Sequence, residues 1–127
     1  MNALLNRLTE LTESPNSTTS LTYKEVYEHW NCQIPEELAE IDGSYAGGYF
    51  VERALLIWNF LSPSDLLSMS IQADLAAPEE RPLVPIIDCT EGDFICFDVQ
   101  SKSFLLWNAI DQMVYESNKS LEAFLPK

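Results

Sequence analysis

Helical spacing of hydrophobic residues marks the first third of the chain. Apolar residues in the first thirteen positions fall on one face of a helix predicted over 2–13, namely Leu4, Leu5, Leu8 and Leu11. The segment SPNSTTS at 14–20 has the composition of a linker. Thr22 and Glu25 have the spacing of a capping box, which predicts a helix from 22 to about 30. Pro35 suits the first turn of a third, short helix, EELAEI, which ends near Gly43.

From residue 49 onwards the pattern becomes that of strands. Tyr49–Leu61 is rich in aromatic and aliphatic residues and is predicted as one strand. Gly47-Gly48 before it permits a tight turn or a close backbone approach. Ser62 followed by Pro63 and Asp65 is typical of a helix start, and that helix is expected to run to about residue 76 before a charged loop at 77–82.

The last third of the chain predicts a strand meander. Leu83–Cys89 and Phe94–Val99 flank a turn at 90–93, and a two-residue loop at 91–92 would place Cys89 opposite Phe94 and Ile87 opposite Cys96. Apolar residues on both faces of this hairpin indicate a central position in the sheet with cover on each side. Phe104–Asn108 is expected as a third strand, and 120–125 as a closing helix.

Together these elements predict an α+β domain with a central antiparallel meander sheet and helices packed around it. Residues 1–21 would be an N-terminal helix and linker, and residues 22–127 the domain itself. A chain of 127 residues with 46% hydrophobic residues is long enough and apolar enough to bury a core.

Acidity is the main feature of the composition. Twenty acids face seven bases, which gives a formal net charge of −13, and no base occurs between Lys24 and Arg53 or between Arg81 and Lys102. Such charge disfavours direct binding to nucleic acid or to an anionic membrane and favours a basic protein partner. Acidity that serves only solubility is the alternative, and charge alone does not separate the two.

The sequence offers little for catalysis or metal binding. His29 is the single histidine, and no phosphate loop or zinc spacing is present, so neither an enzyme nor a cofactor is expected. The three cysteines do not suggest a disulfide framework, and Cys89 and Cys96 are expected to be reduced and buried. No signal peptide or membrane span is recognisable, which predicts a cytoplasmic protein.

Two acidic segments are candidates for partner binding. One consists of Glu36, Glu37, Glu40 and Asp42 with Tyr45 and Tyr49 beside them. Carboxylates interleaved with tyrosines suit a surface that accepts Lys and Arg, whereas the alternative is a solvated helix face. The other candidates are Glu91, Asp93, Asp98 and Trp107, for which turn formation, loop anchoring and core packing are the competing roles.

The order of several short motifs resembles that of the SUKH superfamily, which includes bacterial immunity proteins and fungal cell-wall synthesis regulators. The matching positions are Pro35, Gly47-Gly48, Pro85-Ile86, Gly92-Asp93, Asp98, Trp107, Ser120 and Phe124-Leu125. The resemblance spans roughly residues 22–125 and departs from the family at DGSYAGG, where an Asn-Gly-Gly form is commoner, and in the short segment before Leu83.

The resemblance implies an α+β fold and neutralisation of a cognate bacterial toxin, often a nuclease, by direct binding. An adaptor or regulatory protein of the same fold, bound to a cellular partner, is the alternative. A toxin gene immediately upstream is expected for the first function and not for the second.

Overall fold

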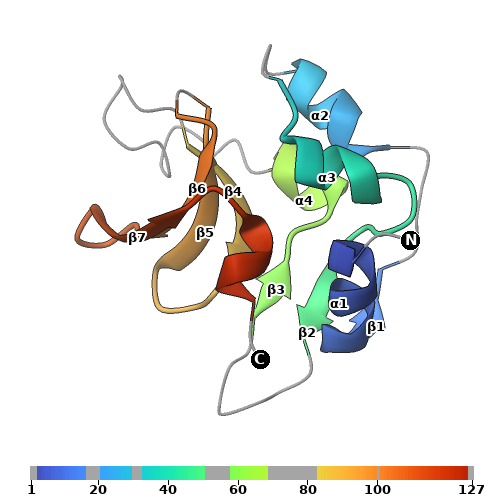
Figure 1. The fold of residues 1–127 in the computed structure, drawn as a ribbon, viewed down its shortest axis with the longest axis horizontal. Coiled ribbons are helices and arrows are strands. Elements are labelled where there is room, and N and C mark those ends of the chain that lie inside the picture. Colours follow the sequence, from blue (N-terminus) through green and yellow to red (C-terminus); the bar gives the residue numbers. More distant parts are fainter. Residues whose placement is uncertain are drawn as a thin grey trace.

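In the part of the chain that the structure describes, one antiparallel sheet of seven strands follows the chain in order, from β1 to β7 (Figure 1). The structure is a computed structural model and describes residues 3–16, 21–29, 33–50, 58–68, 83–99 and 101–125. The strands are β1 (Thr12–Pro15), β2 (Gly48–Phe50), β3 (Asn59–Phe60), β4 (Leu83–Asp88), β5 (Asp93–Asp98), β6 (Ser103–Asn108) and β7 (Met113–Asn118). The helices are α1 (Ala3–Leu11), α2 (Tyr23–His29), α3 (Glu36–Ile41), α4 (Pro63–Ser68) and a 3₁₀ helix, η1 (Leu121–Phe124). This is the α+β meander that the sequence predicts.

The N-terminal segment is part of the domain. Helix α1 ends at Leu11, two residues before the predicted end, and its buried leucines belong to the main core. Residues 12–15 form a strand paired with β2, although Ser14 and Pro15 were expected in a linker. The Thr12 hydroxyl donates to the Leu8 carbonyl at 2.7 Å and so satisfies one of the carbonyls in the last turn of α1.

The prediction of one strand over Tyr49–Leu61 is wrong. Its two ends, β2 and β3, pair antiparallel with Gly48 opposite Phe60 and Tyr49 opposite Asn59. Thirteen residues in one strand would span about 43 Å, well beyond the usual length of a strand in a small domain. The same apolar composition therefore supplies two short neighbouring strands.

The register predicted for the β4–β5 hairpin is also wrong. Asp88 lies opposite Phe94, Ile87 opposite Ile95, and Pro85 opposite Cys96 after a register shift. The connection between β4 and β5 consists of residues 89–92, not of a two-residue loop. Within it Thr90, Glu91 and Gly92 all have positive φ.

Two helix starts have the predicted chemistry. The Thr22 amide donates to the Glu25 carboxylate at 3.1 Å, and the Glu25 amide donates to the Thr22 hydroxyl at 3.2 Å. Ser62 and Asp65 form the same reciprocal pair, with distances of 3.1 and 3.0 Å. The described residues stop at 68 and resume at 83. The predicted continuation of α4 to residue 76 and the predicted loop at 77–82 therefore lie outside them.

Strand β7 was missed by the sequence pattern. It pairs with β6 and lies at one edge of the sheet, with only Val114 partly covered. Its single half-buried position gives no alternation strong enough to predict a strand. The predicted closing helix is present as the 3₁₀ helix η1.

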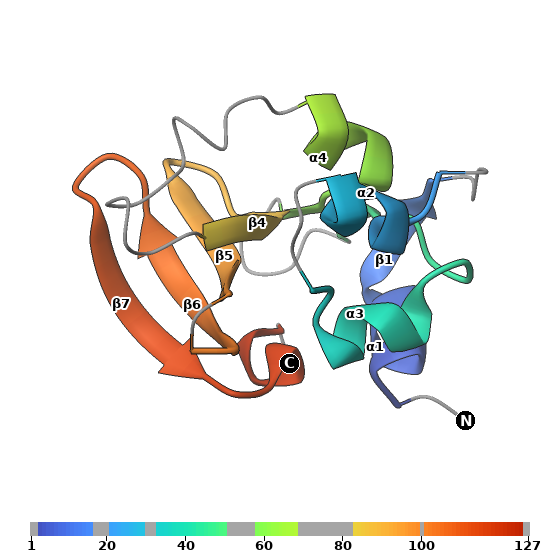
Figure 2. The ribbon, with the colours of Figure 1, turned by 90° about the horizontal axis from the view of Figure 1, so that it is seen from above.

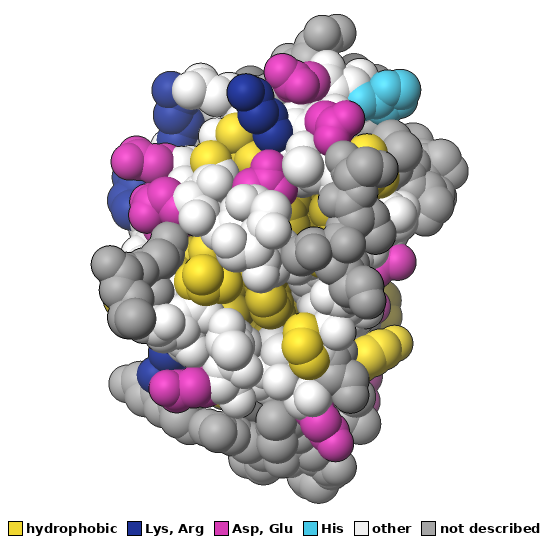
Figure 3. All heavy atoms as spheres, turned by 90° about the vertical axis from the view of Figure 1, so that its right-hand side faces the viewer, with side chains coloured by type: hydrophobic (Ala, Val, Ile, Leu, Met, Phe, Trp, Pro, Cys, Tyr) yellow, Lys and Arg dark blue, Asp and Glu magenta, His cyan; other side chains and the backbone are white. Residues whose placement is uncertain are grey.

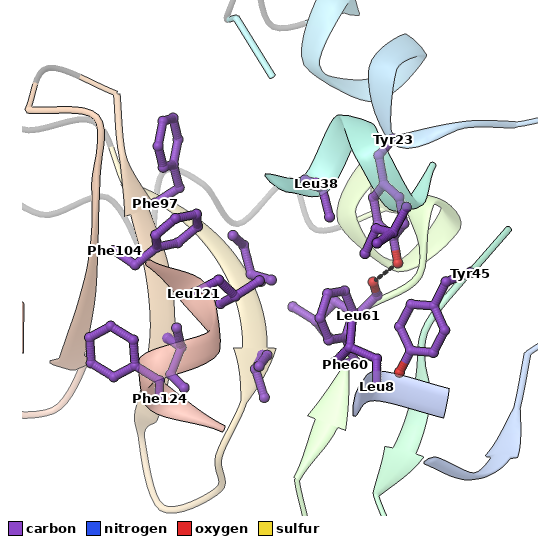
Figure 4. Packing of buried hydrophobic residues seen from close by; sticks show 14 of the residues in the cluster. Leu8, Tyr23, Leu38, Tyr45, Phe60, Leu61, Phe97, Phe104, Leu121 and Phe124 are labelled. Atoms are coloured by element: carbon purple, nitrogen blue, oxygen red, sulfur yellow. Dashed lines mark hydrogen bonds between the residues drawn. The ribbon is translucent and has the colours of Figure 1, made fainter. Parts of the chain in front are cut away.

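Both faces of the sheet are covered, as the sequence predicts. The larger core lies between the sheet and the helices, where Phe104 and Leu121 point toward Leu38 and Phe60 (Figure 4). The Tyr23 hydroxyl ties the helix side to the sheet through a 2.6 Å hydrogen bond to the Leu61 carbonyl. A second cluster on the opposite face contains Leu83, Cys96, Leu105 and Trp107.

No helix within the described ranges is long and apolar enough to cross a membrane.

Candidate functional site

A groove of about 430 Å³ lies between α3 and the end of the sheet that carries the β5–β6 turn. Figure 2 shows α3 facing this end of the sheet next to the C-terminal 3₁₀ helix. Its apolar part comes from Ile34, Pro35, Phe97, Val99 and Phe104. Charged side chains border it on opposite sides, with Glu36, Glu37 and Glu40 on α3 and Lys102 and Lys119 on the sheet side. We call this feature the α3 groove.

The amphipathic pattern of α3 decides which carboxylates reach solvent. Leu38 and Ile41 are buried in the main core, so the opposite side of the helix faces outwards. Glu36 and Glu40 are four residues apart and exposed, and they border the groove on this outward side. These two residues are the members of the predicted acidic set that an approaching partner can reach in the groove.

Glu37 has a structural role. Its carboxylate accepts the Leu121 amide at 3.1 and 3.2 Å and so caps η1, because Ser120 makes no side-chain cap there. Burial is the main cause that raises the pKa of Glu37, and the bonds from backbone amides oppose it. Glu37 therefore joins α3 to the C-terminal helix.

Asp42 and Tyr45 are also used within the fold. The two Asp42 oxygens accept the amides of Tyr23 and Lys24 at 2.9 and 3.1 Å and cap α2. Tyr45 is buried, with its hydroxyl 2.6 Å from that of Thr12, and burial raises the pKa of Tyr45 to about 12. Tyr49 is 59% exposed on β2 and is not among the residues that line the groove.

Of the second predicted segment, Asp98 and Trp107 are buried. Asp98 anchors the next turn, accepting the Ser101 amide at 3.4 Å with its carboxylate and the Lys102 amide at 2.8 Å with its carbonyl. The predicted loop-anchoring role of Asp98 is thus confirmed, and it positions Lys102 at the groove.

Glu91 and Asp93 lie at the other end of β5. Asp93 and Asp98 begin and end that strand, about 17 Å apart at the usual rise per residue. Asp93 accepts the Asn108 side-chain amide at 2.7 Å, while Glu91 is exposed in the turn. The structure therefore places Glu91 and Asp93 away from the α3 groove, whereas Asp98 stands between the groove residues Phe97 and Val99.

Acidic side chains do not merge into one patch on the face that Figure 3 shows. They are spread over it, with Lys and Arg side chains among them in its upper part.

The two lysines of the groove, Lys102 and Lys119, were missed by sequence reasoning, because a count of charge along the chain does not show which bases meet which acids in space. Lys119 is held there by a 2.9 Å bond to the Ser101 carbonyl.

The α3 groove combines an apolar floor with carboxylates on one side and ammonium groups on the other. Carboxylates and ammonium groups on opposite sides of an apolar floor match a polypeptide segment with an apolar side chain between charged ones. Within the described residues, no group of three or more His, Cys, Asp or Glu side chains is placed to hold a metal ion. Cys89 and Cys96 are unpaired and buried, and burial raises the pKa of both thiols.

Comparisons with known proteins found no matching family model, no matching curated protein and no matching solved structure.

Proposed function

We propose that this chain is a non-enzymatic binding protein that neutralises a cognate bacterial toxin by attaching to a basic surface of that toxin through the α3 groove. The motif order that resembles the SUKH superfamily supports toxin neutralisation. The net charge of −13 supports a basic partner.

The observation that carries the proposal is the juxtaposition of Glu36 and Glu40 with an apolar floor. A Lys or Arg of the partner would meet these carboxylates, while an adjacent apolar side chain would be desolvated against Ile34 and Val99, the partly exposed apolar residues of the groove. Charge-assisted bonds next to a buried apolar anchor are typical of the few residues that dominate binding energy. Lys102 and Lys119 on the opposite side would select a segment that also carries an acid.

The experiment is co-expression with the product of the adjacent gene, followed by a pull-down and an assay of cell survival. Glu36→Lys/Glu40→Lys should weaken capture and protection. Glu10→Lys/Glu13→Lys is the matched control, because it makes the same change in net charge at two exposed acids of α1 and β1. Circular dichroism confirms that both variants fold.

Failure of the wild-type chain to capture or protect against the neighbouring protein would contradict toxin neutralisation. Equal losses in the two double variants would contradict the α3 groove as the contact surface, because net charge alone would then account for the effect.

A further inference from the structure

Two of the seven bases of this acidic chain, Lys102 and Lys119, border the α3 groove. Both residues are exposed, and they lie on the side of the groove opposite the carboxylates of α3. Acids on both sides would attract a basic surface more strongly, because each lysine repels an incoming Lys or Arg. The two lysines therefore bear on which segments the groove accepts.

The turn that carries Lys102 is anchored by the buried Asp98. The Lys102 amide donates to the Asp98 carbonyl at 2.8 Å, and the Ser101 amide donates to the Asp98 carboxylate at 3.4 Å. Lys102 is thus presented at the groove from a backbone that the strand end holds in place.

Lys119 is joined to the same turn. Its ammonium group donates to the Ser101 carbonyl at 2.9 Å, next to Lys102 in the chain. This bond connects the segment before β6 with the segment after β7. Two positive charges are therefore held together on the sheet side of the groove.

Glu37 connects the acidic side of the groove to the basic side. Its carboxylate on α3 accepts the Leu121 amide at 3.1 and 3.2 Å, and Leu121 follows Lys119 by two residues. Glu36 and Glu40, on the same helix, are exposed along the groove. Charges of both signs are thus placed across the groove before anything binds, which reduces the cost of ordering on binding.

Charges inside the groove act on a bound segment more strongly than the distant part of the net charge does. At physiological salt the Debye length is about 8 Å, so exposed charges further away are largely screened. A base near the carboxylates of α3 is attracted at this range, whereas a second base on the sheet side is repelled by the two lysines. An acid in that second place is attracted instead. Repulsion of the wrong segment is a common source of specificity.

We propose that Lys102 and Lys119 are specificity-determining residues of the α3 groove, which selects a partner segment with an apolar residue between a base and an acid. The base would meet the carboxylates of α3, the apolar side chain Ile34 and Val99, and the acid the two lysines. A segment with bases on both sides is disfavoured, although the net charge of −13 attracts it. The inference rests on the proposed function, because it names the segment that the same groove takes.

Three capped peptides of equal length, added to the full-length chain, separate this selection from attraction by net charge. They carry Lys-Leu-Glu, Lys-Leu-Lys or Glu-Leu-Glu between the same glycine and serine residues. Amide chemical shifts followed by NMR at about 150 mM salt give both the affinity and the location of binding.

The Lys-Leu-Glu peptide should shift amides within 33–41 and 101–104, where the two sides of the groove lie. It should bind roughly fivefold more tightly than Lys-Leu-Lys, and Glu-Leu-Glu should bind least. Attraction by net charge alone predicts instead that Lys-Leu-Lys binds most tightly.

The matched protein variants are Lys102→Glu and Lys24→Glu, which make the same change in net charge at two exposed lysines. Lys102→Glu should abolish the preference for Lys-Leu-Glu over Lys-Leu-Lys, and Lys24→Glu, on α2, should keep it. Lys102→Gly suits the φ of +55° at this position, so it should lose most of the preference without a lower midpoint of thermal unfolding.

Absence of binding to the folded wild-type protein, tighter binding of Lys-Leu-Lys, or shifts centred outside the α3 groove would overturn the inference. A preference that survives in Lys102→Glu would overturn it as well. None of these results involves the product of the adjacent gene, whose capture tests toxin neutralisation, so the two proposals fail in distinguishable ways.

Discussion

At the scale of single residues, several acids of this chain accept main-chain amides and so hold the backbone in place. Glu37, Asp42 and Asp98 each accept main-chain amides, whereas Glu36 and Glu40 face outwards. Loop anchoring was one of the roles expected for Asp98, because the residue stands at the end of a predicted strand. The sequence pattern could not predict the role of Glu37, because Leu121 lies 84 positions further along the chain.

Removal of the Glu37 carboxylate should destabilise the fold more than removal of its neighbour. Glu37→Ala leaves the Leu121 amide without its acceptor and should lower the free energy of unfolding by about 1 kcal/mol. Glu36→Ala should change it by less than about 0.5 kcal/mol. Urea denaturation of both variants measures the difference, and equal effects would show that the cap contributes nothing.

The cysteine thiols should make stability depend on alkaline pH. Burial is the main cause that raises the pKa of Cys89 to about 12. Because the folded pKa lies above the unfolded one, this contribution to stability is complete below about pH 8.5 and is lost as pH rises toward 12. Between pH 7.5 and 10 the free energy of unfolding of the wild type should fall by about 1–2 kcal/mol more than that of Cys89→Ala.

Denaturant titrations of both proteins at the two pH values provide this measurement. Parallel losses would contradict the raised pKa of Cys89. Native protein at pH 8 should also leave Cys89 and Cys96 unmodified by a thiol reagent that reaches both after unfolding.

At the scale of elements, local chemistry predicted the helix starts well and the strand partners less well. Thr22 with Glu25 and Ser62 with Asp65 are three residues apart, so their capping bonds are visible in the sequence. The division of 49–61 into β2 and β3, and the strand at β7, depend on neighbours that only the folded sheet provides.

Gly47 shows how tightly two elements meet. A Cβ at Gly47 would overlap the Phe60 carbonyl oxygen, whereas a Cβ at Gly43 meets nothing within 4 Å. Both glycines have positive φ, +88° and +85°, so they share the strain that an L side chain would add.

Gly43→Ala should therefore lower the free energy of unfolding by about 1–2 kcal/mol through this strain alone. Gly47→Ala should lower it by at least about 2 kcal/mol more, because its Cβ would also overlap the backbone where β2 meets β3. Thermal and denaturant unfolding of the two variants compare them directly. Equal destabilisation would mean that the backbone moves apart at Gly47 without cost.

At the scale of the whole molecule, the sheet separates two surfaces at opposite ends of β6. The α3 groove, at one end, combines Glu36 and Glu40 with two lysines, and the exposed apolar residues Ile110, Met113 and Tyr115 lie near the other end. The sequence predicted the acidic part of the groove from the spacing on α3. It could not predict the lysines, the apolar floor or the burial of Tyr45, because these follow from how distant elements pack.

The central claim is that the α3 groove receives a basic partner. The most direct test is the rate of association with the product of the adjacent gene, measured by stopped flow at about 50 and about 300 mM salt. The wild-type rate should fall as salt rises, because screening weakens long-range attraction. Glu36→Lys/Glu40→Lys should slow association roughly tenfold at low salt, and Glu10→Lys/Glu13→Lys should slow it much less. Wild-type association that is independent of salt, together with an unchanged rate in the Glu36→Lys/Glu40→Lys variant, would contradict the account and leave acidity with a role in solubility alone.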